Sequence, residues 1–253
     1  MSGSTLFALV SATLVATSIA LPTSAFPTKL SDCPSTFVTA TAGIPAHEIA
    51  SLFSKPTFPQ SPSAAADIEQ IRAAIALYGL ALDGKNFPIL DNVFTPDVRA
   101  NYSALGVMNG VEQLKTTLEA SLEPVASTQH QFGTSVVQLC RDTSAAAGAE
   151  EMSGTTAAIS VTYTTTSHFP LGPDGVVSPS ILAADVMTGF VMYQDVWVKE
   201  GINKDGSCDT NGTAGTSVGS HWRIRARNTV TMVCFPRLLC DPFGPLDVTN
   251  DSY

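Results

Sequence analysis

The chain has 253 residues, of which 44% are apolar and 14% charged, and this provides enough apolar surface for one domain with a sizeable core. The formal net charge of -9, without any cluster of Lys or Arg, opposes binding to nucleic acid. The sequence also lacks a dinucleotide turn, a phosphate loop, a zinc-peptidase helix and histidines at metal-ligand spacing, so we expect no cofactor and no metal.

The first 25 residues resemble a secretory signal peptide. Residues 6–21 form an apolar run that is followed by small residues, so we expect cleavage near Ala25 and a secreted protein. The run is too short to span a bilayer comfortably and no second run follows, so we expect no membrane span. Three sequons are candidate glycosylation sites in a secreted chain, at Asn101, Asn211 and Asn250.

Secretion favours disulfides among the five cysteines, which are Cys33, Cys140, Cys208, Cys234 and Cys240. Cys33 could tie the N-terminal segment to the folded body, and the spacing of Cys234 and Cys240 permits a local loop. The connectivity cannot be read from the sequence, and buried free cysteines remain an alternative.

Residues 26–62 are rich in Pro, Ser and Thr without a regular period, which predicts an irregular arm. From Asp67 onwards, apolar residues recur every three or four positions and predict a helix with one buried face. The helix is expected to end at Asp83-Gly84, because glycine tolerates the left-handed conformation that stops helices. A short helical piece follows and ends before Thr95-Pro96.

The period then changes to two, with Val98, Ala100 and Tyr102 facing inward and Asn101 outward. A second amphipathic helix is predicted over residues 110–122, and four strands over residues 127–140, 157–169, 189–200 and 221–233. The predicted domain covers residues 63–234, and residues 235–253 form a tail. Helices followed by a run of strands indicate an α+β fold, with helices on one face of a curved antiparallel sheet.

Four short motifs occur in a fixed order: Leu77-Tyr78 with residues 81–87, residues 94–99, residues 193–199, and His221-Trp222-Arg223-Ile224. Their order and spacing resemble the SnoaL-like branch of the nuclear-transport-factor-2-like superfamily, over about residues 65–232. The resemblance implies a cone-shaped sheet that wraps an apolar cavity closed by helices on its concave face.

Within that superfamily the chain resembles fungal scytalone dehydratases, which are lyases of secondary metabolism. The resemblance places the catalytic aspartate at Asp83, one water-holding tyrosine at Tyr102, and the two histidines at His130 and His168. Two departures matter. Leu82 stands where the family has its other active-site tyrosine, which removes one of the two groups expected to hold the carbonyl-polarising water. Met192 and Gln194 stand where the family has serine and asparagine, which suggests a different substrate.

These residue types favour proton-transfer chemistry. His130 can take a proton and return it, Asp83 can orient the imidazole, and Tyr102 can donate a hydrogen bond to a developing oxyanion. We therefore predict a cofactor-free dehydratase acting on a small apolar polyketide- or terpenoid-like substrate. An isomerase, a cyclase, an epoxide hydrolase or a non-catalytic ligand-binding protein are the alternatives. Each side chain could also be structural: a helix-ending aspartate, a core tyrosine or a buried hydrogen-bonded histidine.

Residues that share a helix face or a strand parity complete the predicted substrate wall, namely Tyr78, Leu82, Phe132, Gln194 and Asn228. Parity places Gln194 inside, whereas the family pattern would favour Tyr193 with Asp195. By alternation, His168 lies on the face of its strand opposite the apolar residues. It therefore lines the cavity only if that wall is polar or if a bulge shifts the phase of the strand. Arg223, Arg225 and Arg227 are expected to face outward, on a monomer or a homodimer.

Overall fold

The computed structural model describes residues 30–53, 59, 61–142, 157–172, 186–202, 208–209 and 219–235. The predicted signal peptide, the sequons at Asn211 and Asn250, and residues 236–253 of the predicted tail lie outside this part of the chain. The side chains of Cys208 and Cys234, and the whole of Cys240, also lie outside it.

The long helix α3 (Pro62–Asp83) confirms the predicted first helix. Its Ser61 cap accepts a hydrogen bond from the Ala64 amide, and Pro62 occupies the first turn, where its missing N–H costs nothing. The helix ends after Asp83 as predicted, but Gly84 is not the left-handed residue, since its φ is -86°. Lys85 takes that conformation at φ 49°, and its ammonium group donates to the backbone carbonyl of Leu122 at 3.0 Å.

Four long strands form the body of one curled sheet, in the order β4 (Val125–Asp142), β5 (Ala157–Pro170), β6 (Met187–Ile202) and β8 (Gly219–Phe235), and each of the four is antiparallel to the next. On the far side of β8 lie β2 (Phe94–Tyr102) and β3 (Gly106–Asn109), while the short strands β1 (Leu30–Ser31) and β7 (Cys208–Asp209) pair with β4 and β6. The sheet was predicted to be antiparallel, but β2 runs parallel to β8 and makes it mixed.

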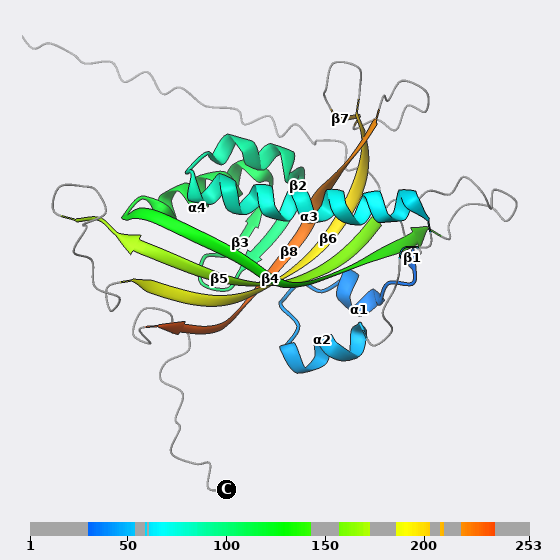
Figure 1. Cartoon of the computed structure of the whole chain (residues 1–253), viewed down its shortest axis with the longest axis horizontal. Coiled ribbons are helices and arrows are strands. Elements are labelled where there is room, and N and C mark those ends of the chain that lie inside the picture. The colour runs from blue at the N-terminus through cyan, green and yellow to red at the C-terminus, as the bar shows by residue number, and fades with distance from the viewer. Residues whose placement is uncertain are drawn as a thin grey trace, which may run out of the picture.

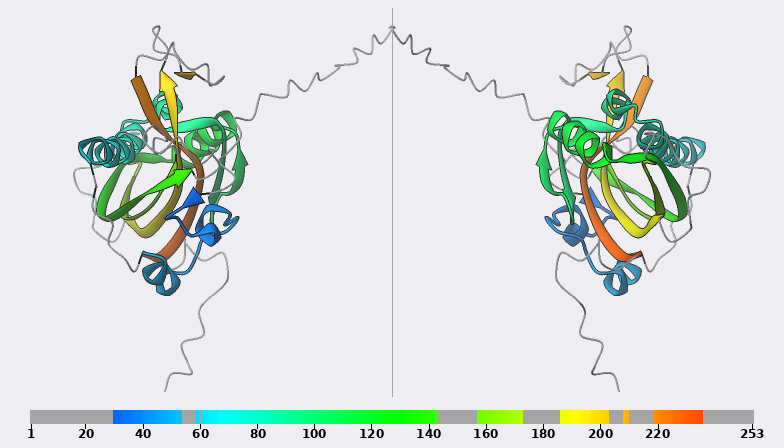
Figure 2. Two further views of the ribbon diagram at one scale, coloured as in Figure 1. Left: turned by 90° about the vertical axis from the view of Figure 1, so that its right-hand side faces the viewer. Right: turned by 90° about the vertical axis from the view of Figure 1, so that its left-hand side faces the viewer.

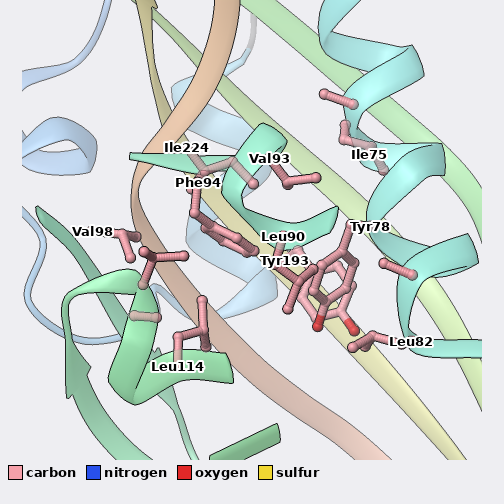
Figure 3. Close-up of a cluster of buried hydrophobic side chains, with 14 of the residues drawn as sticks. Ile75, Tyr78, Leu82, Leu90, Val93, Phe94, Val98, Leu114, Tyr193 and Ile224 are labelled. Carbon is pink, nitrogen blue, oxygen red and sulfur yellow. The ribbon is translucent and has the colours of Figure 1, made fainter. Parts of the chain in front are cut away.

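Helices cover the concave face of the sheet. The helix α3 crosses it, accompanied by the 3-10 helix η1 (Phe87–Asn92) and by α4 (Val111–Leu122), as Figures 1 and 2 show. Apolar side chains from α3, η1, α4 and the strands pack between these layers, including Ile75, Leu90 and Leu114, which appear in Figure 3. The predicted cone of a curved sheet closed by helices is therefore confirmed.

The convex face is covered as well. Residues 30–53, for which an irregular course was expected, contain β1 and two short helices, α1 (Ser35–Val38) and α2 (Ala46–Leu52). Phe37 and Ile49 of these helices pack against the outer side of β5 and β6. A disulfide joins Cys33 to Cys140 of β4, so the predicted tie between the N-terminal segment and the body is confirmed.

Because both faces are covered, β6 is apolar on both sides. Tyr193 and Trp197 face the helices, whereas Met192 and Val196 face α1 and α2. Alternation in such a strand identifies two sets of residues but does not say which set is inside.

Strand β8 also contains a bulge. Val196 pairs with Ala226 and Trp197 with Ile224, so Arg225 is the extra residue. The bulge changes the phase of the strand: Ile224 faces the helices before it, and Arg227 does so after it. The prediction that Arg227 faces outward is wrong, since its side chain is completely buried. Arg223 is also buried, in an ion pair with Glu200.

Candidate functional site

Asp83, the last residue of α3, meets the start of β4 on the concave face. Its Oδ1 lies 2.6 Å from His130 Nδ1 and accepts a hydrogen bond from Thr128 Oγ1 at 2.9 Å. Its Oδ2 accepts one from the His130 backbone amide at 3.0 Å. The carboxylate is therefore fixed by three contacts to one strand, so the predicted approach of Asp83 to His130 is found in the structure.

This arrangement selects one form of the imidazole. The His130 side chain is 5% exposed and Asp83 25%. Burial lowers the pKa of His130 below its ordinary value of 6.5, although Asp83 opposes the shift, so the ring is neutral at neutral pH. The carboxylate accepts the proton on Nδ1 and leaves the lone pair on Nε2, which makes no hydrogen bond to the described residues. Such a nitrogen can act as a base.

His168 lies on the same wall. It pairs across strands with Thr128, whose hydroxyl reaches Asp83, so both side chains are on the concave side. The condition for His168 to face inward, a polar wall, is met, because Ser160, Thr162, Thr164 and Thr166 on this face of β5 are all buried. Burial and the neighbouring His130 lower the pKa of His168, so it too is neutral at neutral pH.

The structure supplies a second tyrosine hydroxyl where the sequence showed Leu82. Leu82 is buried in the apolar cluster, but Tyr78, one turn earlier on α3, places its hydroxyl 2.9 Å from that of Tyr102. Tyr193 of β6 packs edge-on against Tyr78, with ring centroids 5.7 Å apart (Figure 3). Burial raises the pKa of Tyr78 and of Tyr193 well above the ordinary value, so both phenols stay protonated and can donate hydrogen bonds.

A buried cation that no sequence pattern predicts lies beneath these phenols. The Arg227 guanidinium donates to the Asp195 carboxylate at 2.7 and 2.9 Å. It stacks 4.3 Å from the Tyr78 ring and 4.4 Å from the Tyr193 ring, and Nη1 donates to the Tyr102 hydroxyl at 3.4 Å. Burial alone would lower the pKa of Arg227, but Asp195 outweighs it, so the cation is retained. A positive charge here stabilises negative charge that develops on an oxygen bound by the phenols.

Two predicted wall residues, Gln194 and Asn228, do not face the site. The Gln194 amide accepts from the Ile44 N–H at 2.8 Å and donates to the Ile44 carbonyl at 2.6 Å, while Asn228 donates to the Ala40 carbonyl at 3.1 Å. Both therefore hold the N-terminal segment on the convex face. The prediction was wrong for Gln194 because both faces of β6 are buried, and for Asn228 because of the bulge at Arg225. The family pattern of Tyr193 with Asp195 describes the inner face correctly.

Phe132 separates the Asp83–His130 pair from a hollow of about 660 Å³. Its ring stacks on His130 with centroids 6.5 Å apart and lies 6.4 Å from the Tyr193 ring. The hollow is lined by Gln131, Phe132, Gly133, Thr134, Tyr163, Thr164, Thr165, Phe190, Val191 and Met232. Neither Asp83 nor His130 is among them, so Phe132 is the only predicted site residue on this wall.

The described residues contain no group of three or more His, Cys, Asp or Glu side chains that could hold a metal ion. None of the helices in the same part of the chain combines the length and the hydrophobicity that a bilayer crossing requires.

Residues 63–228 match the model of the SnoaL-like domain. The chain belongs to the SnoaL-like family. The SnoaL-like region runs from the first turn of α3 to Asn228 in β8, and so contains the Asp83–His130 pair, the three tyrosines and Arg227. No curated protein shows significant sequence similarity to this SnoaL-like chain.

Solved structures with a similar fold are distant in sequence. A Kribbella flavida protein shares 15% identity at a TM-score of 0.48, covering 69% of this chain and 96% of its own. A Novosphingobium aromaticivorans protein, provisionally named a scytalone dehydratase, shares 15% identity at a TM-score of 0.45, and the match covers 67% of this chain and 87% of that protein. A hexachlorocyclohexane dehydrochlorinase from Novosphingobium barchaimii shares 11% identity at a TM-score of 0.44, and the match covers 72% of this chain and 97% of that protein. Membership of the SnoaL-like family rests on the domain match.

Proposed function

We propose that this SnoaL-like protein is a cofactor-free dehydratase of secondary metabolism, acting on a small, flat, mostly apolar polyketide- or terpenoid-like substrate. The observation that carries the proposal is the 2.6 Å contact between Asp83 and a buried, neutral His130. Such a pair is an oriented general base, and burial strengthens the interaction between its members.

The reaction that suits this geometry is elimination of water beside a carbonyl group. His130 Nε2 takes a proton from the carbon next to the carbonyl, and Asp83 stabilises the imidazolium that forms. The hydroxyls of Tyr78 and Tyr102 are hydrogen-bonded to each other, so one of them donates to its neighbour and the other donates to the enolate oxygen, with Arg227 behind them. The carbon–oxygen bond at the adjacent carbon then breaks, the double bond forms, and the imidazolium returns its proton to the departing hydroxide as water.

The same base can support an isomerase, a cyclase or an epoxide hydrolase, and the reaction product distinguishes these. A ligand-binding protein without turnover is supported by a different observation: the hollow of about 660 Å³ is lined by neither Asp83 nor His130. Mass spectrometry of ligands that co-purify with the native protein would identify its ligand, and product analysis would show whether that ligand is turned over.

We also propose that the protein is made in the secretory pathway. The Cys33–Cys140 disulfide supports this, because such bonds persist in oxidising compartments. Fractionation of the native host would place the protein inside or outside the cell.

The first prediction concerns His130. The test reaction is exchange of the protons beside the carbonyl of 2-tetralone in D2O, followed by NMR, because it requires a base and an oxyanion donor but no leaving group. We expect His130→Gln to slow enzyme-dependent exchange by about 100-fold or more, since a positioned general base contributes roughly 10²–10⁴-fold. The matched control is His47→Gln, at a histidine whose side chain is 81% exposed. Equal exchange rates in wild-type protein and His130→Gln would remove His130 from the mechanism.

A further inference from the structure

The hollow beside Phe132 has the size of a small-molecule site, at about 660 Å³. Five of its ten described lining residues are aromatic or aliphatic, and none of these ten carries a charge. Phe190 and Met232 are 39% and 45% exposed, so they leave apolar surface in contact with water at its rim. Covering this surface with an apolar ligand is favourable, and a neutral ligand suits a lining without ions.

The strand register places the hollow next to His130. Phe132, Thr164 and Val191 are cross-strand partners and form one row over β4, β5 and β6. His130 and Thr166 form the neighbouring row on the same face. Side chains two residues apart on a strand are separated by about 7 Å, which is close to the width of one six-membered ring and its contacts. A flat ligand lying across the Phe132 row therefore reaches the His130 row with its next ring.

Thr164 is the polar group in the middle of this row. On the same face of β5, the Thr162 hydroxyl lies 3.1 Å from Ser135 Oγ and the Thr166 hydroxyl donates to the Gly189 carbonyl at 3.4 Å. The Thr164 hydroxyl is buried and makes no hydrogen bond to the described residues. Buried hydroxyls without a partner are uncommon, because each loses its hydrogen bonds to water.

The Thr164 hydroxyl can be turned into the hollow. Rotation of χ1 by about 120° permutes the hydroxyl, the methyl group and the hydrogen on Cβ, so one staggered rotamer places the hydroxyl where the methyl group now lies. The hydroxyl gives up no protein hydrogen bond in turning. A ligand oxygen at this point would supply the partner that the described residues do not.

We propose that the hollow binds the remote ring of a fused aromatic ligand, with the Thr164 hydroxyl hydrogen-bonded to a neutral hydroxyl or carbonyl oxygen on that ring. The reacting ring then lies beyond Phe132, beside His130 Nε2. The inference that the reacting ring lies beside His130 rests on the proposed function, whereas binding of the remote ring does not require turnover.

The test compares 2-naphthol with 2-methylnaphthalene, two fused-ring probes of nearly equal shape that differ in one hydroxyl. Dissociation constants are measured by fluorescence titration of the full-length protein. We expect wild-type protein to prefer 2-naphthol, and Thr164→Val, which replaces the hydroxyl by a methyl group, to weaken 2-naphthol binding about fivefold, the usual effect of one neutral hydrogen bond. Binding of 2-methylnaphthalene should stay within twofold. Thr162→Val is the matched control, because that residue shares the strand face but does not line the hollow.

Failure of 2-naphthol to bind wild-type protein overturns the proposal, as does equal weakening of both probes by Thr164→Val. A thermal melt of each variant shows whether it is folded. If Thr164→Val were not folded, Phe132→Leu would replace it, and the proposal would then require weaker binding of both probes. The 2-tetralone exchange assay on the same preparations distinguishes failure of the two proposals. Exchange without selective 2-naphthol binding would contradict the ring-binding site alone. Selective 2-naphthol binding without exchange would contradict the role of His130 as base alone.

Discussion

At the scale of single residues, the pKa of His130 is set by opposing effects. Burial lowers it below 6.5 and the positive charge of Arg227 lowers it further, whereas the Asp83 carboxylate raises it. A protonated imidazole cannot accept a proton, so activity that depends on His130 should fall as the pH falls through a midpoint below 6.5.

The second prediction follows from the Asp83 contribution to that pKa. Asp83→Asn keeps the shape of the side chain but removes the charge that favours the imidazolium, so the acid limb of kcat/KM should move to lower pH. We also expect the activity to drop by up to about 10⁴-fold, the loss seen when the aspartate that orients a catalytic histidine is replaced by asparagine. The measurement is the pH profile of 2-tetralone exchange, together with an NMR titration of His130.

Asp97→Asn provides the control, because Asp97 pairs with Arg225 and makes no contact with His130. A limb that moves to higher pH, or an unchanged profile in Asp83→Asn, would contradict the assigned role of the carboxylate.

Single residues also show what sequence patterns can predict. Asp83, Tyr102 and His130 were selected by residue type and resemblance, and the structure brings Asp83 and His130 into contact while Tyr102 bonds to Tyr78. Arg227 is not predicted as a site residue from the sequence, because its inward direction depends on the bulge two residues earlier, at Arg225. A bulge is one unpaired residue in a ladder and leaves no periodic signal of its own.

At the scale of elements, the approach of α3 to β4 brings Asp83 to His130. Gly79 permits it: a Cβ added at this position would lie 2.5 Å from the Phe132 ring and 3.4 Å from the His130 Cβ. Glycine is ordinarily unfavourable inside a helix by about 1 kcal/mol relative to alanine, so its presence here is explained by the close packing of helix on strand.

The third prediction tests this packing. Gly79→Ala alone should not gain the stability of about 1 kcal/mol that helix propensity provides, because the new methyl group displaces the Phe132 ring. Combined with Phe132→Leu, which removes the ring, the same change should be stabilising by about that amount. Urea denaturation of wild-type protein, both single variants and the double variant measures the difference.

Additive effects of the two substitutions would mean that Gly79 and Phe132 do not interact. The single variant Gly79→Ala should also alter 2-naphthol binding, since the ring it displaces is part of the hollow.

At the scale of the whole molecule, the N-terminal segment closes the convex face of the sheet. Gln194 and Asn228 hold its backbone, and the Cys33–Cys140 disulfide fixes one end. The outer face therefore carries α1 and α2 rather than a bare sheet. Whether the protein is a monomer or a homodimer remains a prediction, which sedimentation analysis can test.

The fourth prediction concerns that disulfide. Its cysteines are 107 residues apart, so it restricts a large loop of the unfolded chain. Replacing both cysteines with serine should lower the free energy of unfolding by about 2–4 kcal/mol, as chain-entropy arguments and measured disulfide removals indicate. Exchange activity below the unfolding temperature should persist, because the disulfide lies on the face opposite His130.

Dithiothreitol should reproduce the loss of stability in the wild-type protein and have no further effect on the double variant. Equal stability of wild-type and double variant would show that the bond contributes nothing to the folded state.

Local patterns along the chain are sufficient for the elements that depend on neighbouring residues: the helix that ends at Asp83, the four long strands and the residues that share each face. Packing between distant segments settles which face is inside, that β2 joins β8 in parallel, that the Tyr78 hydroxyl meets that of Tyr102, and that Arg227 lies beneath the phenols. Periodicity is a local property of the chain, whereas the covered face and the surroundings of Arg227 depend on contacts between segments more than 100 residues apart.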